Sequence, residues 1–193
     1  GVRGVTGLLV GAFDPPHNGH VALARAALDH FVLERLRVLV VAAPAHKPVE
    51  TDSERRLRLA RLAFADLPRT EVVLDDHAYT VDSVRDPRLV PDDALFLIGA
   101  DQFASFLTWR EPEEILAQVR LGVATRPGYP RDRLEAVRTR LDSSDRVEFF
   151  EIPAVPISSR EIRARLADGA SIEGLVPEPV AQEIADSGAY RHV

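Results

Sequence analysis

Six short apolar runs alternate with amphipathic stretches along this chain, and this alternation limits the folds open to it. The intervening stretches repeat their apolar residues every three to four positions, which is typical of helices. Strands that alternate with helices predict a mostly parallel sheet with right-handed crossovers, and continuous apolar runs favour strands covered on both faces. We therefore expect an α/β fold with helices on both faces of the sheet. The apolar runs span residues 7–13, 36–43, 71–75, 94–99, 120–125 and 146–152.

Helices are expected between and after these runs. Asp52 or Ser53 can cap the second helix, and Gly169 and Gly188 stand where helix ends favour glycine. At 193 residues the whole chain, 1–193, is expected to form a single domain whose C-terminal helical part begins at about residue 157. The expected helices run from about His20 to Phe31 and over 53–65, 80–84, 112–119, 131–141, about 159–168 and about 178–187.

Composition narrows the class of protein. The chain is 46% apolar and 28% charged, as in ordinary globular proteins, and without cysteine it forms no disulfides. No apolar run approaches the roughly 18 residues of a membrane span, and no basic-then-apolar leader begins the chain. A net charge of −6 without a basic stripe argues against a nucleic-acid partner. We expect a cytoplasmic protein with no membrane partner; a homo-oligomer is left open.

The first apolar run breaks at a proline pair, where residues 11–20 read G-A-F-D-P-P-H-N-G-H. The N–H groups at the start of the following helix attract anions, and Gly19 is expected to let a ligand approach the backbone. His17 and His20 aimed at one spot predict a bound polyphosphate. The alternatives are that both histidines are loop and cap residues, or that they bind metal. No cysteine or second histidine pair completes a zinc site.

Lys47 stands out because it is the only lysine among 24 basic residues. It follows the second apolar run, at a strand end, where a compact ammonium suits a phosphate as a point charge. The alternative is an ordinary surface lysine. His17, Asp101 and Ser158 likewise follow the first, fourth and sixth runs. Ligands of parallel sheets bind beyond the carboxyl ends of the strands, so these residues are expected to meet.

A second motif lies near the C-terminus, where residues 157–163 read I-S-S-R-E-I-R. Ser158 and Glu161 fit a capping box, which would fix a helix start there and build a second site that attracts anions. Arg163 lies one turn further and could reach phosphate oxygens with its guanidinium. A capping box alone is common, so the motif gains weight mainly from its pairing with F-D-P-P-H-x-G-H.

Together the two strings resemble the signatures of bacterial nicotinate mononucleotide adenylyltransferases, a family of the H-x-G-H nucleotidylyltransferase superfamily. The resemblance covers essentially the whole chain and implies a Rossmann-like, doubly wound fold. Five positions depart from the family's usual residues, and they bear on acceptor specificity and rate: Val10, Ala12, Ala45, Ala78 and Arg160. Further similar segments are 46–48, 55–63, 79–83, 96–101, 107–109 and 174–177.

The resemblance implies transfer of AMP from ATP to nicotinate mononucleotide, which gives deamido-NAD and pyrophosphate in NAD biosynthesis, with Mg²⁺ as the usual companion. The candidate residues are hydrogen-bond donors and cations without a serine–histidine–acid set, so we expect direct attack in line on the α-phosphorus of ATP. Two alternatives are kept. One is the same fold acting on another phosphorylated acceptor, such as phosphopantetheine or a sugar or alcohol phosphate. The other is a non-catalytic nucleotide-binding relative.

The same resemblance implies roles for individual residues. Trp109 would stack on the pyridine ring, although a lone tryptophan is commonly core packing, and Asp101 and Thr80 could each be simple helix caps. His30, His77 and His192 are expected to be surface or structural residues. The catalytic set is His17, His20, Lys47 and Arg163. The ATP-binding set is Gly11, Ala12, Phe13, His17, His20, Gly99, Asp101, Ile157, Ser158, Ser159 and Arg163. The acceptor-binding set is Tyr79, Thr80 and Trp109.

Overall fold

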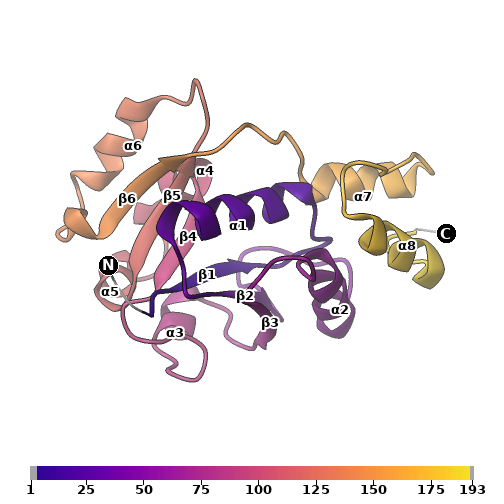
Figure 1. Cartoon of the computed structure of the whole chain (residues 1–193), viewed down its shortest axis with the longest axis horizontal. Coiled ribbons are helices and arrows are strands. Elements are labelled where there is room, and N and C mark those ends of the chain that lie inside the picture. Colours follow the sequence, from indigo (N-terminus) through magenta and orange to yellow (C-terminus); the bar gives the residue numbers. More distant parts are fainter. Residues whose placement is uncertain (1–3, 192–193) are drawn as a thin grey trace.

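The computed structural model describes residues 4–191, which build a six-stranded sheet flanked by helices (Figure 1). The strands lie in the order β3-β2-β1-β4-β5-β6, and every neighbouring pair is parallel. This confirms the expected Rossmann-like, doubly wound α/β fold. The strand order reverses between β1 and β4, which is where ligands bind in such sheets. The strands are β1 (Thr6–Gly11), β2 (Arg35–Val41), β3 (Thr70–Asp75), β4 (Leu95–Gly99), β5 (Arg120–Thr125) and β6 (Val147–Glu151).

Each of the seven helices expected from the sequence is present, with shifts of a few residues at some ends. The first helix begins at Asn18, earlier than expected, because His17 caps it. A five-residue helix, α4, and two 3₁₀ turns were missed because they are too short to show an apolar repeat. The helices are α1 (Asn18–Phe31), α2 (Ser53–Ala63), α3 (Thr80–Val84), α4 (Ala100–Ala104), α5 (Pro112–Gln118), α6 (Arg131–Arg138), α7 (Ser159–Ala167) and α8 (Glu178–Ser187); the 3₁₀ turns are Phe106–Thr108 and Ser144–Arg146.

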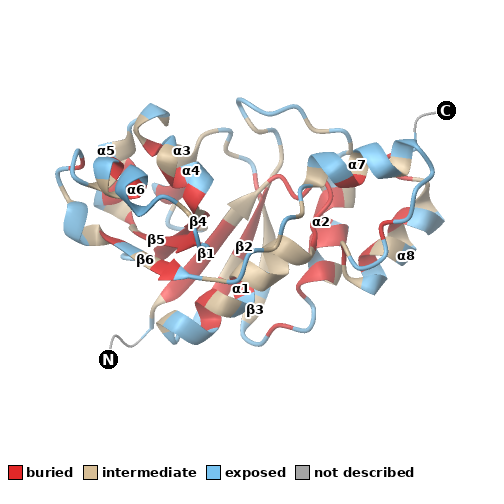
Figure 2. Cartoon of the chain, turned by 90° about the horizontal axis from the view of Figure 1, so that it is seen from above, coloured by how far each residue is buried: buried red, intermediate tan, exposed pale blue. Residues whose placement is uncertain are grey.

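Two apolar cores lie on opposite faces of the sheet. Leu9 of β1 belongs to the core that α1 and α2 cover, whereas its neighbour Leu8 belongs to the core under α3, α4, α5 and α6. Figure 2 shows the buried residues concentrated in the strands and on the inner sides of the helices. Ile162 of α7 and Val180 of α8 extend the first core, so the C-terminal helices pack beside α2 at one end of the molecule (Figure 1).

Helix ends follow the sequence expectations in most places. Asp52, rather than Ser53, caps α2 by accepting a hydrogen bond from the Arg55 N–H at 2.8 Å. Gly169 and Gly188 have φ of +72° and +70°, the left-handed backbone that favours glycine after a helix. His192 lies outside the described residues. Within residues 4–191, none of the helices has the length and apolar character needed to span a bilayer.

Candidate active site

Two cavities lie beyond the carboxyl ends of β1 and β4, on either side of the strand reversal. The larger, the Trp109 cavity, has a volume of about 580 Å³ and the smaller, the imidazole cavity, about 310 Å³. Gln102 of α4 lines both, so the cavities adjoin. The predicted residues that line the Trp109 cavity are Gly11, Ala12, Lys47, Tyr79, Thr80 and Trp109. Those that line the imidazole cavity are His17, His20, Gly99, Asp101 and Ile157. Ser158 lines a neighbouring hollow together with Asp101 and Ile157.

Backbone hydrogen bonds fix the protonation pattern of the two signature histidines. Nδ1 of His17 accepts from the Gly19 N–H, and Nδ1 of His20 accepts from the His17 N–H, both at 3.0 Å. A neutral imidazole whose Nδ1 accepts carries its proton on Nε2. The two rings stack with centroids 3.7 Å apart and an interplanar angle of 24°. The start of α1 therefore presents two parallel rings, each with an Nε2–H donor. The histidines are cap residues, as one alternative held, and they also line a cavity.

Electrostatics keep both rings neutral. Burial, with a contribution from the charge of Lys47, lowers the pKa of His17 to about 4. Burial also lowers the pKa of His20 well below 6.5, and His17 and Lys47 act in the same direction. At neutral pH the pair therefore supplies hydrogen-bond donors, while Lys47 supplies the positive charge that reaches them. Such fixed donors suit an anion that gains charge during a reaction.

Gly19 has a role that differs from the expected one. A Cβ built on Gly19 would lie 2.8 Å from Cε1 and 2.9 Å from Nδ1 of His17, closer than real Cβ contacts come. The space at this glycine is therefore filled by the His17 ring itself, not by an approaching ligand. Glycine between the two histidines allows the first ring to fold back over its own helix start, which is what creates the stack.

Three of the predicted residues hold the turn before α1 and do not line either cavity. Arg163 Nη1 donates to the Asp14 carbonyl at 2.8 Å, and Ser159 Oγ donates to the Pro15 carbonyl at 2.7 Å. The Phe13 ring is 2% exposed and meets the His20 ring edge-on, with centroids 4.9 Å apart. Through these contacts α7 supports the segment that carries the histidines. Their direct contact with ATP stays a prediction.

A buried arginine that sequence reasoning passed over secures the same turn. Arg56 of α2 is 0% exposed, and its guanidinium donates to four backbone carbonyls. These carbonyls lie at the end of β2 and in the segments after β1 and β2, so one side chain ties the two strand ends to α2. The signal was present, because Arg56 shares the helix face of the buried residues Leu59, Ala60 and Ala63. The carbonyls belong to Ala12, Val41, Ala42 and Thr51.

Asp14 is a second buried group that the sequence did not single out. Its side chain is 2% exposed, and it accepts hydrogen bonds from the Tyr190 hydroxyl and the Glu50 N–H, both at 2.7 Å. Burial, together with the hydrogen bond to the Asp14 carboxylate, raises the pKa of Tyr190. The residues after α8 thereby reach the turn that precedes His17. Nothing in the sequence pattern links positions 176 residues apart.

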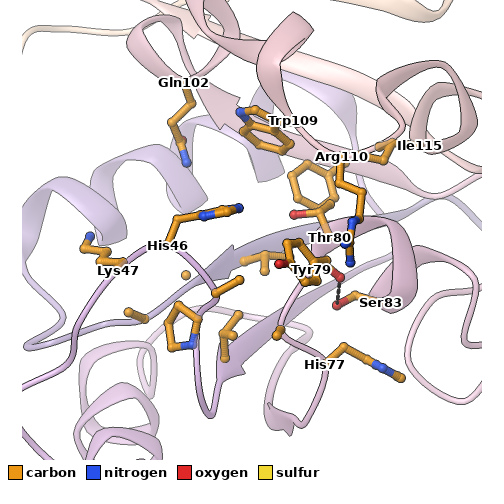
Figure 3. A pocket seen from close by; sticks show the side chains of 18 of the residues that line it. His46, Lys47, His77, Tyr79, Thr80, Ser83, Gln102, Trp109, Arg110 and Ile115 are labelled. Atoms are coloured by element: carbon orange, nitrogen blue, oxygen red, sulfur yellow. Dashed lines mark hydrogen bonds between the residues drawn. The ribbon is translucent and has the colours of Figure 1, made fainter.

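The Trp109 cavity has aromatic walls (Figure 3). Trp109 packs against Phe106, with ring centroids 5.2 Å apart, and it also lines the cavity, so it joins the core and the site. The Tyr79 ring lies across from it, 5.5 Å from the His46 ring centroid. Arg110, which sequence reasoning missed, places its guanidinium carbon 3.8 Å from the Tyr79 centroid. The cavity could thus receive a flat ring that carries an anionic group.

Some proposed alternatives and motif details are wrong. Thr80 and Asp101 are not helix caps, because Tyr79 and Gly99 hold the cap positions of α3 and α4. Ser158 Oγ accepts from the Glu161 N–H at 3.1 Å, as in a capping box. The reciprocal hydrogen bond, from the Ser158 N–H to the Glu161 carboxylate, is not formed. The Glu161 carboxylate instead lies 3.8 Å from Nε of Arg165, one turn along the exposed face of α7.

The remaining two histidines that were assigned no catalytic role have structural partners. The His30 ring stacks on Phe150 with centroids 5.3 Å apart, at the exposed end of α1. His77 borders the Trp109 cavity, where its Nε2 lies 2.9 Å from the Asp86 carboxylate. That hydrogen bond raises the pKa of His77. Asp86 therefore fixes the position of His77 at the edge of the cavity.

The acidic side chains at the site show how the expected magnesium ion could be held. Among residues 4–191, no three His, Cys, Asp or Glu side chains gather closely enough to hold a metal ion. Asp101 is the one described acidic side chain that lines the imidazole cavity, at its exposed rim and 3.7 Å from Arg126. Magnesium commonly binds through one or two carboxylates, substrate phosphates and several waters. The residues present fit an ion that arrives on a triphosphate.

Comparisons with known proteins show the family of the chain. Residues 8–165 match the family model described as cytidylyltransferase-like. The probable nicotinate-nucleotide adenylyltransferases of Bordetella avium and Thermus thermophilus are 38% and 40% identical to the chain; the matches cover 96% of the chain in both cases, and 97% and 98% of those proteins.

A Plasmodium falciparum nicotinic acid mononucleotide adenylyltransferase complexed with NaAD superposes with a TM-score of 0.77 at 17% identity, which covers 97% of this chain and 98% of that one. At this identity the match supports the fold alone. The assignment of the chain to a family rests on the relatives that match over nearly their full length at 38% and 40% identity. The chain belongs to the nicotinate-nucleotide adenylyltransferase family, within the cytidylyltransferase-like proteins.

Proposed function

We propose that the chain transfers AMP from ATP to nicotinate mononucleotide, giving deamido-NAD and pyrophosphate as a step of NAD biosynthesis. The observation that carries the proposal is the stacked histidine pair. It presents two Nε2–H donors beside the charge of Lys47, next to two adjoining cavities. Two nucleotides that meet end to end at their phosphates need this kind of paired site. The names of the relatives support the choice of substrates.

In this proposal ATP occupies the imidazole cavity. Gly99 and Asp101 at the end of β4 would contact its ribose, and Ile157 with Ser158 would lie near the adenine. The Nε2–H groups of His17 and His20 would donate to phosphate oxygens, with Lys47 at the pyrophosphate. Gly11 and Ala12 line the adjoining Trp109 cavity and would lie next to the phosphates where the two cavities meet. Ser159, Arg163 and Phe13 would act mainly through the turn they hold in place.

Nicotinate mononucleotide would occupy the Trp109 cavity, with its pyridine ring against Trp109 and its edge near Tyr79 and Thr80. Its 5′-phosphate would then point toward the histidine pair, where Lys47 lines the same cavity. This pose directs an acceptor oxygen at the α-phosphorus of ATP. Alignment of the two substrates supplies a large share of the rate in reactions of this kind.

The chemistry is a direct displacement. An oxygen of the acceptor phosphate forms a bond to the α-phosphorus while the bond from that phosphorus to the bridging oxygen breaks, and the electron pair leaves with pyrophosphate. The acceptor is already an anion, so no base is needed. The neutral imidazoles stabilise the oxygens that gain charge. Magnesium bound to the triphosphate would neutralise part of its charge, with Asp101 at the rim within reach of such an ion.

An acceptor panel tests the function. With ATP and Mg²⁺, we expect nicotinate mononucleotide to give pyrophosphate release far above phosphopantetheine and above sugar and alcohol phosphates. Release with one of those acceptors instead would favour the alternative acceptor class. Binding of ATP without release from any acceptor would favour a non-catalytic relative. A chiral α-phosphorothioate should be inverted at phosphorus, and retention would contradict direct displacement.

A further inference from the structure

Gln102 stands at the boundary between the two cavities. Among residues 4–191 it is the one residue that lines both the Trp109 cavity and the imidazole cavity. It lies in the short helix α4, one position after the segment 96–101 that resembles the family. In the proposed function one nucleotide fills each cavity, so a residue shared by both lies where the two phosphate groups would meet.

A backbone hydrogen bond fixes the orientation of the Gln102 amide. Its Oε1 accepts from the Gly99 N–H at 3.0 Å. Because an N–H donates to the oxygen of an amide and not to its nitrogen, Nε2 is the atom on the other side of the group. Figure 3 shows the side chain pointing into the Trp109 cavity. Within the described part of the chain no oxygen accepts from Nε2, so its two N–H donors are available to a ligand.

The other polar groups of the site each line one cavity. Lys47 lines the Trp109 cavity, whereas His17 and His20 line the imidazole cavity. The charge of Lys47 nevertheless contributes to the low pKa of both histidines, so the phosphate ends of the two cavities face each other. Two phosphate groups brought together at this boundary repel each other. A group that donates to both at once would offset part of that repulsion.

We propose that Gln102 is a further catalytic residue, which donates one Nε2–H to the acceptor phosphate and the other to the α-phosphate of ATP. This inference rests on the proposed function. The bridge is complete only when both nucleotides are bound and their phosphates approach each other. An interaction of this kind raises turnover and has little effect on the binding of either substrate alone. The amide stays neutral and transfers no proton, so the bond changes remain those of the direct displacement.

Two variants of the full chain separate this role from the cap that Gln102 places on α4. Gln102→Met has a similar length but no donor, and it should lower the turnover number for pyrophosphate release by about 10- to 100-fold. Its affinities for ATP and for nicotinate mononucleotide, each measured alone by titration calorimetry, should stay within about 3-fold. Gln102→Glu keeps an oxygen for the Gly99 N–H, as glutamate does in a capping box, but turns a carboxylate toward the phosphates. It should keep the midpoint of urea unfolding and lose at least as much turnover.

Gln182→Met is the matched control. Gln182 lies on α8, donates to the Asp186 carboxylate at 2.8 Å and lines neither cavity, so turnover and both affinities should be unchanged. The inference is overturned if either Gln102 variant keeps its turnover while the unmodified protein is active. It is also overturned if Gln102→Met loses ATP affinity as much as turnover, because damage to the α4 cap beside Gly99 and Asp101 would do that. If the unmodified protein itself forms no dinucleotide, the proposed function fails, and the inference fails with it.

Discussion

At the scale of single residues, the H-x-G-H segment presents hydrogen-bond donors held in fixed positions. The Nδ1 atoms of His17 and His20 are occupied by backbone N–H groups, so only Nε2–H remains to face a ligand. Burial keeps the pKa of each ring low, so at neutral pH each is a neutral imidazole and not an imidazolium that could act as a general acid. Neutral rings of this kind can stabilise negative charge through hydrogen bonds, but they cannot act as general acids.

His20→Ala should reduce turnover by about 100- to 1000-fold, because it removes one fixed donor to the reacting phosphates. The midpoint of urea unfolding should change little. Steady-state pyrophosphate release together with unfolding curves checks both. His30→Ala, on the same helix but away from both cavities, is the control and should keep full activity. Unchanged turnover in His20→Ala would remove the residue from the mechanism.

Gly19→Ala should lower turnover by about 100-fold, since the new methyl group would displace the His17 ring on which the stack depends. Ala22→Gly in the same helix changes helix propensity by a similar amount in the opposite, destabilising direction, on the order of 1 kcal/mol, and leaves Gly19 beside the ring unchanged. It should retain activity. A Gly19→Ala protein with normal turnover would show that the stacked geometry is dispensable.

At the scale of elements, the turn before α1 is held from two sides. α2 holds it through Arg56, and the C-terminal segment holds it through Arg163 and Tyr190. The sequence predicted the helices themselves from their apolar spacing. It could not show these contacts, because each joins a polar side chain to a backbone or carboxylate far away in the chain. The segment that carries the two histidines is therefore held by contacts that only the packed structure reveals.

Tyr190→Phe tests this coupling. Losing the hydroxyl leaves the buried Asp14 carboxylate one donor short, so the free energy of unfolding should fall by about 1.5–3 kcal/mol. Pyrophosphate release should also fall several-fold, because Asp14 belongs to the turn that leads to His17. Chemical denaturation and steady-state rates give the two values.

Arg58→Gln is the control at this scale. It removes an exposed ion pair between α2 and α8, in which Arg58 lies 2.9 Å from Glu183. Such surface pairs contribute about 1 kcal/mol or less, so stability should barely change and activity should be kept. A Tyr190→Phe protein as stable and active as the unmodified one would contradict the coupling.

At the scale of the whole molecule, apolar patterning was enough to predict the sheet and its layers, and the motif positions were enough to place the site at the strand ends. Tyr79, Thr80 and Trp109 line one cavity, and Lys47, which was expected to meet His17 and Asp101, lines this cavity and not theirs. Arg110 was missed because an exposed arginine after a tryptophan has no distinctive pattern. Folding brings it over the ring of Tyr79, the cap residue of α3, where it lines the cavity.

The free energy of unfolding should depend on pH because His17 and His20 are buried in their neutral form. The folded-state pKa of His17 is lowered from 6.5 to about 4, whereas the unfolded chain takes up the proton near 6.5. The unfolded state thus binds more protons below about pH 6.5, and the free energy of unfolding falls as the pH drops toward 4. His17 alone should cost about 2 kcal/mol at about pH 5 relative to about pH 7.

Denaturant unfolding at both pH values, for the unmodified protein and His17→Gln, isolates this effect. The variant should lose less stability on acidification. Asp75, whose pKa is raised by burial, acts in the opposite direction but is present in both proteins. Equal losses in the two proteins would show that His17 is not held neutral.

Product stoichiometry distinguishes transfer of AMP to the acceptor from hydrolysis of ATP. A limiting amount of nicotinate mononucleotide is mixed with excess ATP and Mg²⁺, and all nucleotide products are quantified. We expect one dinucleotide and one pyrophosphate for each acceptor molecule consumed. Formation of ADP with phosphate, of AMP without dinucleotide, or of no product would contradict it.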